Sequence, residues 1–387
     1  MQKDFHYYAT YCAAFLAGYS HEESLAVCYS AQLTDYFSAT LLGKIGGPKE
    51  AATTQLNMEL MNMRPDILSL QQITRIWASF HFLPRDLYAR KKGCTRGYLN
   101  KYRLICGPNG DLIEDTVRLA SGASLQAAGL AMHVLADTWA HRYFAGTPSL
   151  VINNTDDFFY EIIDDNEGNS ERKISFRHSP SGKDDLDNSI YNNSVFQSNE
   201  ISILNLGHAR AGHLPDYSFI CYKYMPAWAD YDDVVKNNPK DYMCAFRQMV
   251  YALKCIRDTG VSFVKDTYDE ESVGPCEDRI MSILETRKPI CCDEWKAFGE
   301  ELSGCEIEDF DLSRYQDEYR QASAEEKDNT FLGRYIVAAL RQKSMVTNKI
   351  FMSGNLLAGI SVDYQKKGLK GIRDYFRIIE NTRGDAE

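Results

Sequence analysis

Apolar residues recur at three- and four-residue spacings over much of the chain, which is the periodicity of amphipathic helices. Ser20 followed by Glu23 has the pattern of a capping box and predicts a helix that begins there and continues to about Leu42. Helix follows helix, without the alternation of strands and helices that is typical of parallel sheets. The helical segments expected in the first part of the chain are residues 5–17, 20–42, 65–82 and 115–143.

Residues 147–205 break this pattern. They are rich in Asn, Asp, Ser and Gly and contain two short strand-like runs, Ser149–Asn153 and Lys173–His178. We expect an irregular insertion that carries a β-hairpin and forms a flap over part of the molecule. Helical periodicity returns at Tyr242–Val264 and again from Asn329 to about Ile379.

These segments predict a mainly α-helical fold built as a multi-helix bundle. The bundle is expected over residues 1–260, interrupted by the insertion at 147–205. Residues 265–328 are acidic and broken by Gly and Pro. Residues 261–387 are therefore expected to form an acidic linker and a helical C-terminal region packed on the bundle.

Charge and cysteine content narrow the class of protein. The chain has 387 residues, a formal net charge of −11 and eleven cysteines without the regular spacing of a disulfide framework. The negative charge argues against general affinity for nucleic acids, and the cysteines are typical of reduced thiols in the cytosol. Neither a signal peptide nor a membrane-spanning apolar run is evident. We expect a cytoplasmic protein without a transmembrane segment, with signal-independent export left open.

One helical stretch, Gly129–Gly146, carries polar residues where a buried helix would normally have none. His133, Asp137 and His141 are spaced four residues apart, and each such step turns the side chain by only about 40° around a helix. The three therefore lie on one stripe, flanked by apolar residues. Burying two imidazoles and a carboxylate is costly unless a partner compensates for the lost water, and metal ions commonly do so.

The helical rise limits how this stripe can bind metal. His133 and His141 are about 12 Å apart along the helix axis, so one ion is not expected to contact both. Either Asp137 bridges two ions, or His141 contacts a ligand rather than an ion. Imidazole and carboxylate together are typical of zinc, and of iron or manganese in mixed sites. A cluster of two or three ions fits the number of candidate ligands better than a single ion.

Most of the remaining histidines stand in unusual contexts. His6 follows Asp-Phe, His81 precedes Phe-Leu-Pro, and His208 and His213 belong to one short segment, 205–216. Any one of them alone is more simply interpreted as an ordinary core or surface histidine. Because the chain has only eight histidines, their grouping with Asp35 and Asp137 makes that interpretation weaker.

In this order the motifs resemble the mostly helical superfamily of zinc-dependent phospholipases C and single-strand nucleases. They look closer still to an uncharacterised bacterial family related to it. The matching segments are Asp4-Phe-His6, Ala31-Gln-Leu-Thr-Asp35, Phe80-His-Phe-Leu-Pro84, His133-x3-Asp137, Gly207-His208 and Pro215-Asp216. The resemblance implies a cluster of two or three zinc ions. Its ligands would be His6, Asp35, His81, His133, Asp137 and His208, with His141 and Asp216 as further candidates.

The chain also departs from the pattern of those phospholipases. Their ligands include the amino terminus of a mature Trp, whereas this sequence begins with Met1. Their helix places the next histidine six residues after the aspartate, whereas His141 follows Asp137 by four. Gly212 stands where they have a glutamate ligand. The third ion and the reaction therefore stay open.

Three residues are candidates for direct roles in catalysis. Asp216 or Asp4 would serve as general base. Arg142 is a candidate phosphate partner, but it lies about 100° from the stripe, so a packing or salt-bridge role is an equal alternative. The basic run Arg85–Arg103 is either a guide for an anionic substrate or a solvated loop.

The leading hypothesis is a metal-dependent phosphoester hydrolase, similar to phospholipase C, in which metal-activated water attacks phosphorus. Zn²⁺ is the expected ion, with Mn²⁺ or Fe²⁺ as alternatives. The substrate would be an anionic phosphoester, so nucleic acid enters only as a candidate substrate. One rival is an amide or ester hydrolase that uses the same metal site. The other is a non-catalytic interaction protein with a structural metal cluster, binding a protein partner through its C-terminal region.

Overall fold

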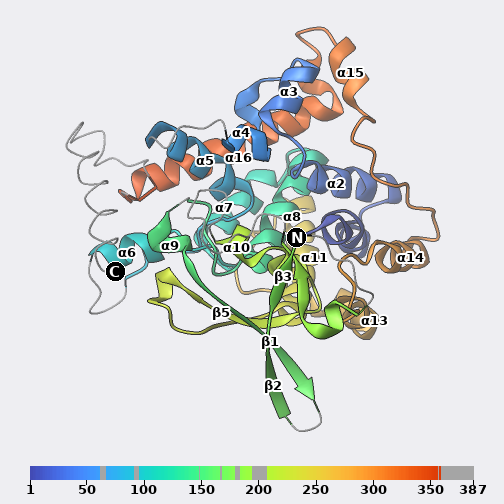
Figure 1. The fold of residues 1–387 in the computed structure, drawn as a ribbon. Helices are drawn as coiled ribbons and strands as arrows, with labels where there is room; N and C mark the ends of the chain where they lie inside the picture. Colours follow the sequence, from blue (N-terminus) through green and yellow to red (C-terminus); the bar gives the residue numbers. More distant parts are fainter. Residues whose placement is uncertain are drawn as a thin grey trace.

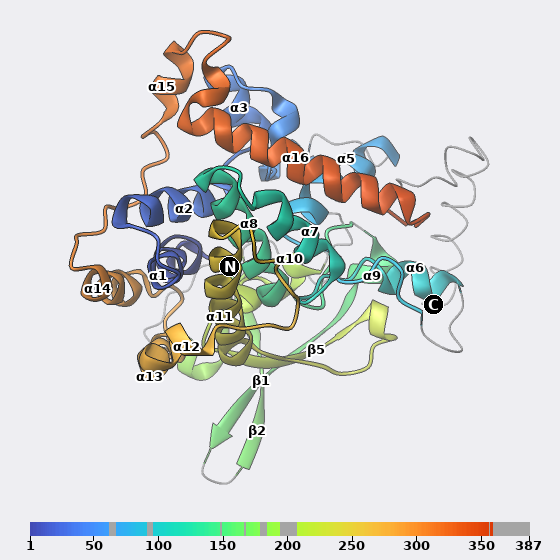
Figure 2. The ribbon, with the colours of Figure 1, turned by 180° about the vertical axis from the view of Figure 1, so that it is seen from behind.

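Helices make up most of the computed structural model, as Figures 1 and 2 show. The structure describes residues 1–61, 67–90, 96–147, 149–165, 168–178, 184–193, 207–355 and 357–358. The mainly helical class predicted from the sequence is therefore confirmed, but a curled antiparallel sheet accompanies the helices. The part of the predicted last helix beyond residue 358 lies outside the described residues.

The first half of the chain forms a group of helices around α8. These helices are η1 (Asp4–Ala9), α1 (Thr10–Leu16), α2 (His21–Leu33), α3 (Ala39–Ile45), η2 (Lys49–Ala51), α4 (Asn57–Met61), α5 (Ile67–Phe80), α6 (Arg96–Tyr102), α7 (Asp111–Ala120) and α8 (Leu125–Ala140). The predicted capping box is present, since Ser20 Oγ accepts from Glu23 N and the Glu23 carboxylate accepts from Ser20 N. Alpha-helix α8 packs against α2, α7, α11 and α16, so it lies at the centre of the helical core.

The two longest helices predicted in this half are each interrupted. The helix expected over 115–143 is two helices, α7 and α8, because Gly122 takes a left-handed φ of 67° and Ser124 then caps α8 by accepting from Ala127 N. The helix expected from Ser20 to Leu42 ends at Leu33. Ser38 starts α3 in the same way, by accepting from Leu41 N. In both cases a serine cap satisfies the free N–H groups of a new helix.

The insertion contributes most of a sheet. Its strands are β1 (Thr155–Asp165), β2 (Gly168–Lys173), β3 (Ser175–Arg177) and β4 (Ile190–Asn192), and the later strands are β5 (Cys221–Pro226) and β6 (Val234–Asn237). A four-stranded antiparallel sheet has the order β2-β1-β5-β6, and β3 pairs with β4 in parallel. The β1–β2 hairpin projects away from the helices in both views (Figures 1 and 2).

The hairpin was predicted, but not from the segments that form it. The strand-like run Ser149–Asn153 is instead the short helix α9 (Leu150–Asn153). Lys173–His178 contains β3, which pairs with β4 and not with β1. Strands β5 and β6 were not expected, although every second residue of β5 is buried. Pairing with β1 and β6 satisfies the β5 backbone.

The rest of the chain is helical and returns to the first half. Its elements are η3 (Leu186–Asn188), α10 (His208–Ala211), η5 (Leu214–Asp216), η6 (Ala227–Ala229), α11 (Asn238–Arg257), α12 (Glu270–Val273), η7 (Gly274–Cys276), α13 (Glu277–Leu284), α14 (Cys292–Ser303), α15 (Gln316–Gln321), η8 (Lys327–Asn329) and α16 (Phe331–Met352). Helix α14 packs on η1, and α16 crosses α5, α7 and α8. None of the described helices has the length and apolar character that crossing a membrane requires.

Candidate metal centre

Eight histidine and aspartate side chains, from segments far apart in the sequence, meet at the inner end of α8. Three groups, of which the first two share His133, each have ligand atoms within 4.8 Å of one another: His6, His133 and Asp137; Asp35, His81 and His133; and His141, His208 and Asp216. All seven metal ligands predicted from the sequence belong to these groups. The eighth member, Asp216, was predicted as a general base and as a further candidate ligand.

The local structure of each segment places its side chain in the centre. His6 lies in η1, a π-helical turn, which is a rare conformation that recurs at functional sites. His133 and Asp137 lie within α8, and His141 is its C-cap. The remaining four residues stand at or next to the ends of elements: Asp35 after α2, His81 after α5, His208 at the start of α10 and Asp216 at the end of η5.

Close packing of α8 on α2 brings Asp35 next to His133. A Cβ atom on Gly129 would overlap the Val27 carbonyl and lie 2.6 Å from Ser30 Cβ, so only glycine allows this approach. Asp35 Oδ1 then lies 3.9 Å from both His81 Nδ1 and His133 Nε2. One glycine in α8 thus determines how a residue beyond the end of α2 reaches the centre.

The carboxylate of Asp137 is the central group. Its Oδ1 lies 3.2 Å from His6 Nε2, and its Oδ2 lies 3.1 Å from His81 Nδ1 and 3.2 Å from His133 Nε2. Its Oδ2 is also 3.5 Å from His141 Nδ1. One oxygen of Asp137 therefore faces His6 and the other faces three histidines, as expected of a carboxylate that bridges two ions.

A second set of groups lies toward the other side of Asp137. Asp216 Oδ1 is 3.4 Å from His141 Nε2 and 3.3 Å from His208 Nε2. The α-amino group of Met1 lies among them, 2.9 Å from Asp137 Oδ1, 3.2 Å from Asp216 Oδ1 and 3.3 Å from His141 Nε2. Figures 1 and 2 show this end of the chain beside α8.

Backbone hydrogen bonds orient two of the histidines so that the other ring nitrogen of each faces the centre. His81 Nε2 lies 3.1 Å from the Thr53 carbonyl, and His141 Nδ1 lies 2.7 Å from the His81 carbonyl. A carbonyl only accepts, so these nitrogens carry the protons. The other ring nitrogens, His81 Nδ1 and His141 Nε2, face the carboxylates, where they could bind a metal ion, as ring nitrogens do when a hydrogen bond holds the opposite side of the imidazole.

Several buried nitrogens in the centre lack a hydrogen bond. Both ring nitrogens of His6 and the Nδ1 of His133 make none to any described residue. His81 Nδ1 and His133 Nε2 face each other at 3.2 Å, and at most one proton can lie between them. Tetrahedral zinc, with bonds of about 2.0–2.2 Å to nitrogen and oxygen, holds neighbouring ligand atoms about 3.3 Å apart. The donor types and their spacing therefore fit such an ion.

Electrostatics also favour a cation here. Burial would lower the pKa of the Met1 amine, but the Asp137 and Asp216 carboxylates outweigh it and raise that pKa to about 11. Burial lowers the pKa values of His6, His133 and His141 to about 4, so these rings are neutral at pH 7. Despite its burial, Asp137 has a pKa well below its usual range because His141, the Met1 amine and other histidines surround it. Neutral imidazoles and ionised carboxylates are the forms that bind metal.

The centre lies at the end of a cavity of about 420 Å³. One part of the wall belongs to the candidate metal centre and includes Asp35, His81, Asp137, His141 and Asp216. Another part is apolar, formed by Leu60, Ile73, Trp77, Phe82 and Ala145. Polar residues on the rest of the wall include Thr54, Gln55, Asn57, Asn153 and His213. A small molecule can therefore reach the ligand atoms and contact an apolar surface beside them.

Two residues predicted to act in catalysis lie away from the cavity. Asp4 is buried and accepts from the backbone N–H groups of Phe5 and Cys291, and burial raises its pKa to about 6. The Arg142 guanidinium lies 3.4 Å from the Asp241 carboxylate and against the Tyr143 ring. Neither residue is among the described residues that line the cavity, and neither is any described residue of the basic run Arg85–Arg103.

Sequence reasoning did not find three features of the centre. The Met1 amine was not predicted as a member, although the phospholipases that the chain resembles use an amino terminus as a ligand, because Met1 replaces their mature Trp. Phe82 stacks on His141 with ring centroids 4.7 Å apart, and Trp77 stands 5.0 Å from His81. The aromatic residues flanking His81 were a visible signal, but spacing alone could not show that they line a cavity.

Comparison with known proteins identifies a family whose function is unknown. The model of a family of unknown function, DUF6765, matches residues 1–350, and the chain belongs to this family. Neither a curated protein nor a solved structure has significant similarity to the chain.

Proposed function

We propose that this member of the DUF6765 family is a zinc-dependent phosphoester hydrolase with a centre of two or three ions. The observation that carries the proposal is the convergence of eight histidine and aspartate side chains around Asp137, at the end of an accessible cavity. Structural metal sites are closed, whereas catalytic sites keep a position open for water or substrate. A ligand set that forms part of a cavity wall favours the catalytic kind.

The ligands divide into three sets, two of which share His133. His6, His133 and Asp137 would hold one ion, and Asp35, His81 and His133 line the position of a second. His141, His208 and Asp216 would hold the third. His133 belongs to both the first and the second set. These two sets would therefore bind either two ions close together or a single ion with alternative ligands. Two ions is therefore the minimum that this arrangement supports.

Bound zinc ions would activate water and neutralise the charge that develops on a phosphoryl group. The protein's own residues would orient the substrate and would accept or donate protons. Of the two carboxylates predicted as general base, Asp4 does not line the cavity, and Asp216 lines it but would serve as a ligand of the third ion. His213 Nδ1 lies 3.2 Å from Asp216 Oδ2, and this hydrogen bond raises the pKa of His213. His213 lines the cavity, where it would supply a proton to a leaving group.

The cavity walls favour a phosphodiester over a more highly charged phosphate. No described lysine or arginine lines the cavity, so the charge of the substrate would be balanced by the ions alone. The apolar wall around Trp77 and Phe82 would contact an uncharged group on one side of the phosphate.

Hydrolysis assays of purified full-length protein test this proposal. We expect protein reconstituted with Zn²⁺ to hydrolyse bis(p-nitrophenyl) phosphate, to lose this activity on chelation and to recover it when Zn²⁺ is restored. Hydrolysis of p-nitrophenyl acetate without hydrolysis of the diester would instead identify an ester hydrolase at the same centre. Bound zinc with no turnover of either compound would indicate a structural cluster and contradict the enzymatic function.

A further inference from the structure

Thr53 lies outside the set of candidate ligands, but it hydrogen-bonds to two segments that carry them. It stands between η2 and α4 and is fully buried. Its hydroxyl group donates to the Thr34 carbonyl at 2.7 Å, and its own carbonyl accepts from His81 Nε2 at 3.1 Å. One residue therefore connects the turn after α2, which carries Asp35, to the end of α5, which precedes His81.

The turn that carries Asp35 is attached to Thr53 at both of its ends. Besides the hydroxyl bond to Thr34, the Thr53 N–H group donates to the Phe37 carbonyl at 2.8 Å. On the other side of the turn, Thr34 Oγ1 accepts from the Tyr335 hydroxyl of α16 at 2.9 Å. These partners are all buried, so each hydrogen bond is costly to lose. The position of the Asp35 backbone therefore depends on Thr53.

The Asp35 side chain is oriented from within α2. Gln32 Nε2 donates to Asp35 Oδ2 at 3.1 Å. The other oxygen, Asp35 Oδ1, lies 3.9 Å from both His81 Nδ1 and His133 Nε2. Gln32 thus directs the carboxylate, whereas Thr53 places the backbone that carries it and also holds the far side of the His81 ring.

We infer that Thr53 is a positioning residue for one ion of the centre, whose ligands would be Asp35, His81 and His133. The inference rests on the proposed metal-dependent function. Thr53 would supply no ligand atom of its own. Instead, its carbonyl keeps His81 Nδ1 directed at the ion, and its hydroxyl group keeps Asp35 at the distance from His81 that a shared ion requires.

Thr53 is connected to only one of the three ligand groups. Within the described part of the chain, none of its hydrogen bonds reaches the candidate ligands outside that group, which are His6, Asp137, His141, His208 and Asp216. Loss of the Thr53 hydroxyl group should therefore weaken the binding of one ion and leave the ions of the other groups bound.

Zinc affinities of the purified full-length protein, measured by competition with a chromophoric chelator, test this inference. Thr53→Val removes the hydroxyl group and keeps the shape and the backbone carbonyl. We expect one zinc ion to bind about 10–100-fold more weakly than in wild type, as loss of a hydrogen bond that supports a ligand predicts. Thr53→Ser keeps the hydroxyl group and should bind this ion like wild type. In cobalt-substituted protein, the visible absorption bands should change in Thr53→Val and return in Thr53→Ser.

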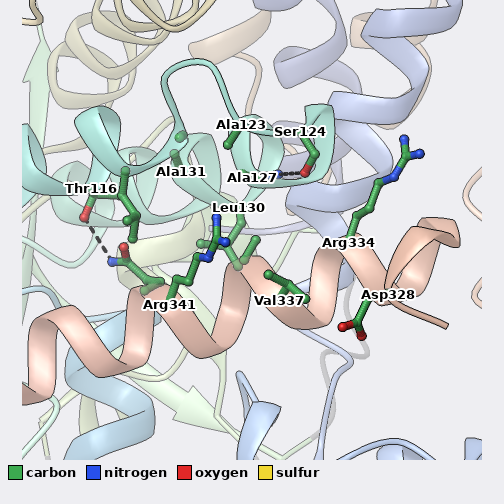
Figure 3. A pocket seen from close by; sticks show the side chains of 14 residues that line it. Thr116, Ala123, Ser124, Ala127, Leu130, Ala131, Asp328, Arg334, Val337 and Arg341 are labelled. Atoms are coloured by element: carbon green, nitrogen blue, oxygen red, sulfur yellow. Dashed lines mark hydrogen bonds between the residues drawn. The ribbon is translucent and has the colours of Figure 1, made fainter. Parts of the chain in front are cut away.

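Thr116→Val is the matched control. Thr116 is also buried, but it lines a separate cavity between α8 and α16, where its Oγ1 accepts from Gln342 Nε2 at 3.0 Å (Figure 3). Its substitution should leave every zinc affinity unchanged. Circular dichroism shows which variants are folded. Thr53→Ala, which places no methyl group against the Thr34 carbonyl, gives the same test if Thr53→Val does not fold.

Three results would overturn the inference and leave the metal centre in place. In the first, folded Thr53→Val binds all its zinc as tightly as wild type. In the second, Thr53→Ser loses as much affinity as Thr53→Val, so the hydroxyl group is not responsible. In the third, Thr116→Val loses as much as Thr53→Val, so the effect comes from a general loss of packing. Wild-type protein that binds no zinc would contradict the proposed function and this inference together.

Discussion

Asp137 is the residue whose loss should affect the metal centre most. Its Oδ1 faces His6 and the Met1 amine, and its Oδ2 faces His81, His133 and His141. Asp137→Asn replaces one of these oxygens by an NH₂ group, which cannot bind zinc. We expect this variant to lose most of its bound zinc and to reduce diester hydrolysis about 100-fold or more.

Metal analysis and circular dichroism of the purified variant check this prediction. Asp317→Asn, a substitution of the same kind at an exposed residue on α15, should keep both zinc and activity. A folded Asp137→Asn protein with full zinc content would show that the Asp137 carboxylate is not a ligand.

Lys343 gives the protein a pH dependence that is independent of the centre. Burial lowers its pKa from 10.5 to about 8, while its Nζ donates to the Glu50 carbonyl at 2.6 Å. The folded protein therefore binds this proton less tightly than the unfolded chain does. The resulting cost is absent above pH 10.5, grows as pH falls, and is complete below about pH 8.

Lys343→Met should remove this cost. The variant should therefore gain stability over wild type at pH 7, and the gain should shrink as pH rises from 8 toward 10.5. Urea unfolding at several pH values measures the difference in free energy of unfolding between the variant and wild type. Other titrating groups are common to both proteins, so their contributions cancel in this difference. A difference that does not vary with pH over this range would contradict the lowered pKa of Lys343.

At the scale of elements, the contact between α2 and α8 depends on Gly129. In an ordinary helix, Gly→Ala adds about 1 kcal/mol of helix stability. Here the new methyl group would overlap the Val27 carbonyl, so Gly129→Ala should lower the free energy of unfolding by about 1–3 kcal/mol and move Asp35 away from His133. Gly274→Ala is the control, because it has helical backbone angles and open space around it. Equal stability of the two variants would show that α2 and α8 do not pack closely at Gly129.

Sequence patterns predicted some elements more accurately than others. The stripe of His133, Asp137 and His141 follows from helical spacing, and the structure places all three at one centre. The ends of the helices were harder to predict, because the turn at Gly122 lies inside a stretch whose helical character is strong on both sides. Strands β5 and β6 are stabilised by pairing with β1 and with each other, which no local pattern reports.

At the scale of the whole molecule, the centre joins two hydrophobic clusters. One is helical and includes residues from η1 to α16; the other surrounds the sheet and includes Phe82, Phe144 and Tyr224. His6 and His133 come from the helical side, whereas His208 and Asp216 come from segments next to the sheet. The sequence could suggest that His208 and Asp216 join His133 only through the resemblance to a known order of motifs, since spacing does not show which segments meet.

Because the ligands come from six separate segments, bound metal should stabilise the entire fold. Metal at 100–1,000 times its Kd contributes about 2.7–4.1 kcal/mol, so chelation should lower the Tm of a 387-residue chain by about 3–5 °C. Differential scanning calorimetry with and without chelator measures this shift. An unchanged Tm would indicate that the folded chain does not bind the metal tightly.

The most direct test of the central claim is elemental analysis of the purified full-length protein after exhaustive dialysis. The arrangement around Asp137 predicts two or three zinc ions per chain, most of which Asp137→Asn should lose. A chain that contains no bound metal, and takes up none when Zn²⁺, Mn²⁺ or Fe²⁺ is supplied, would contradict it.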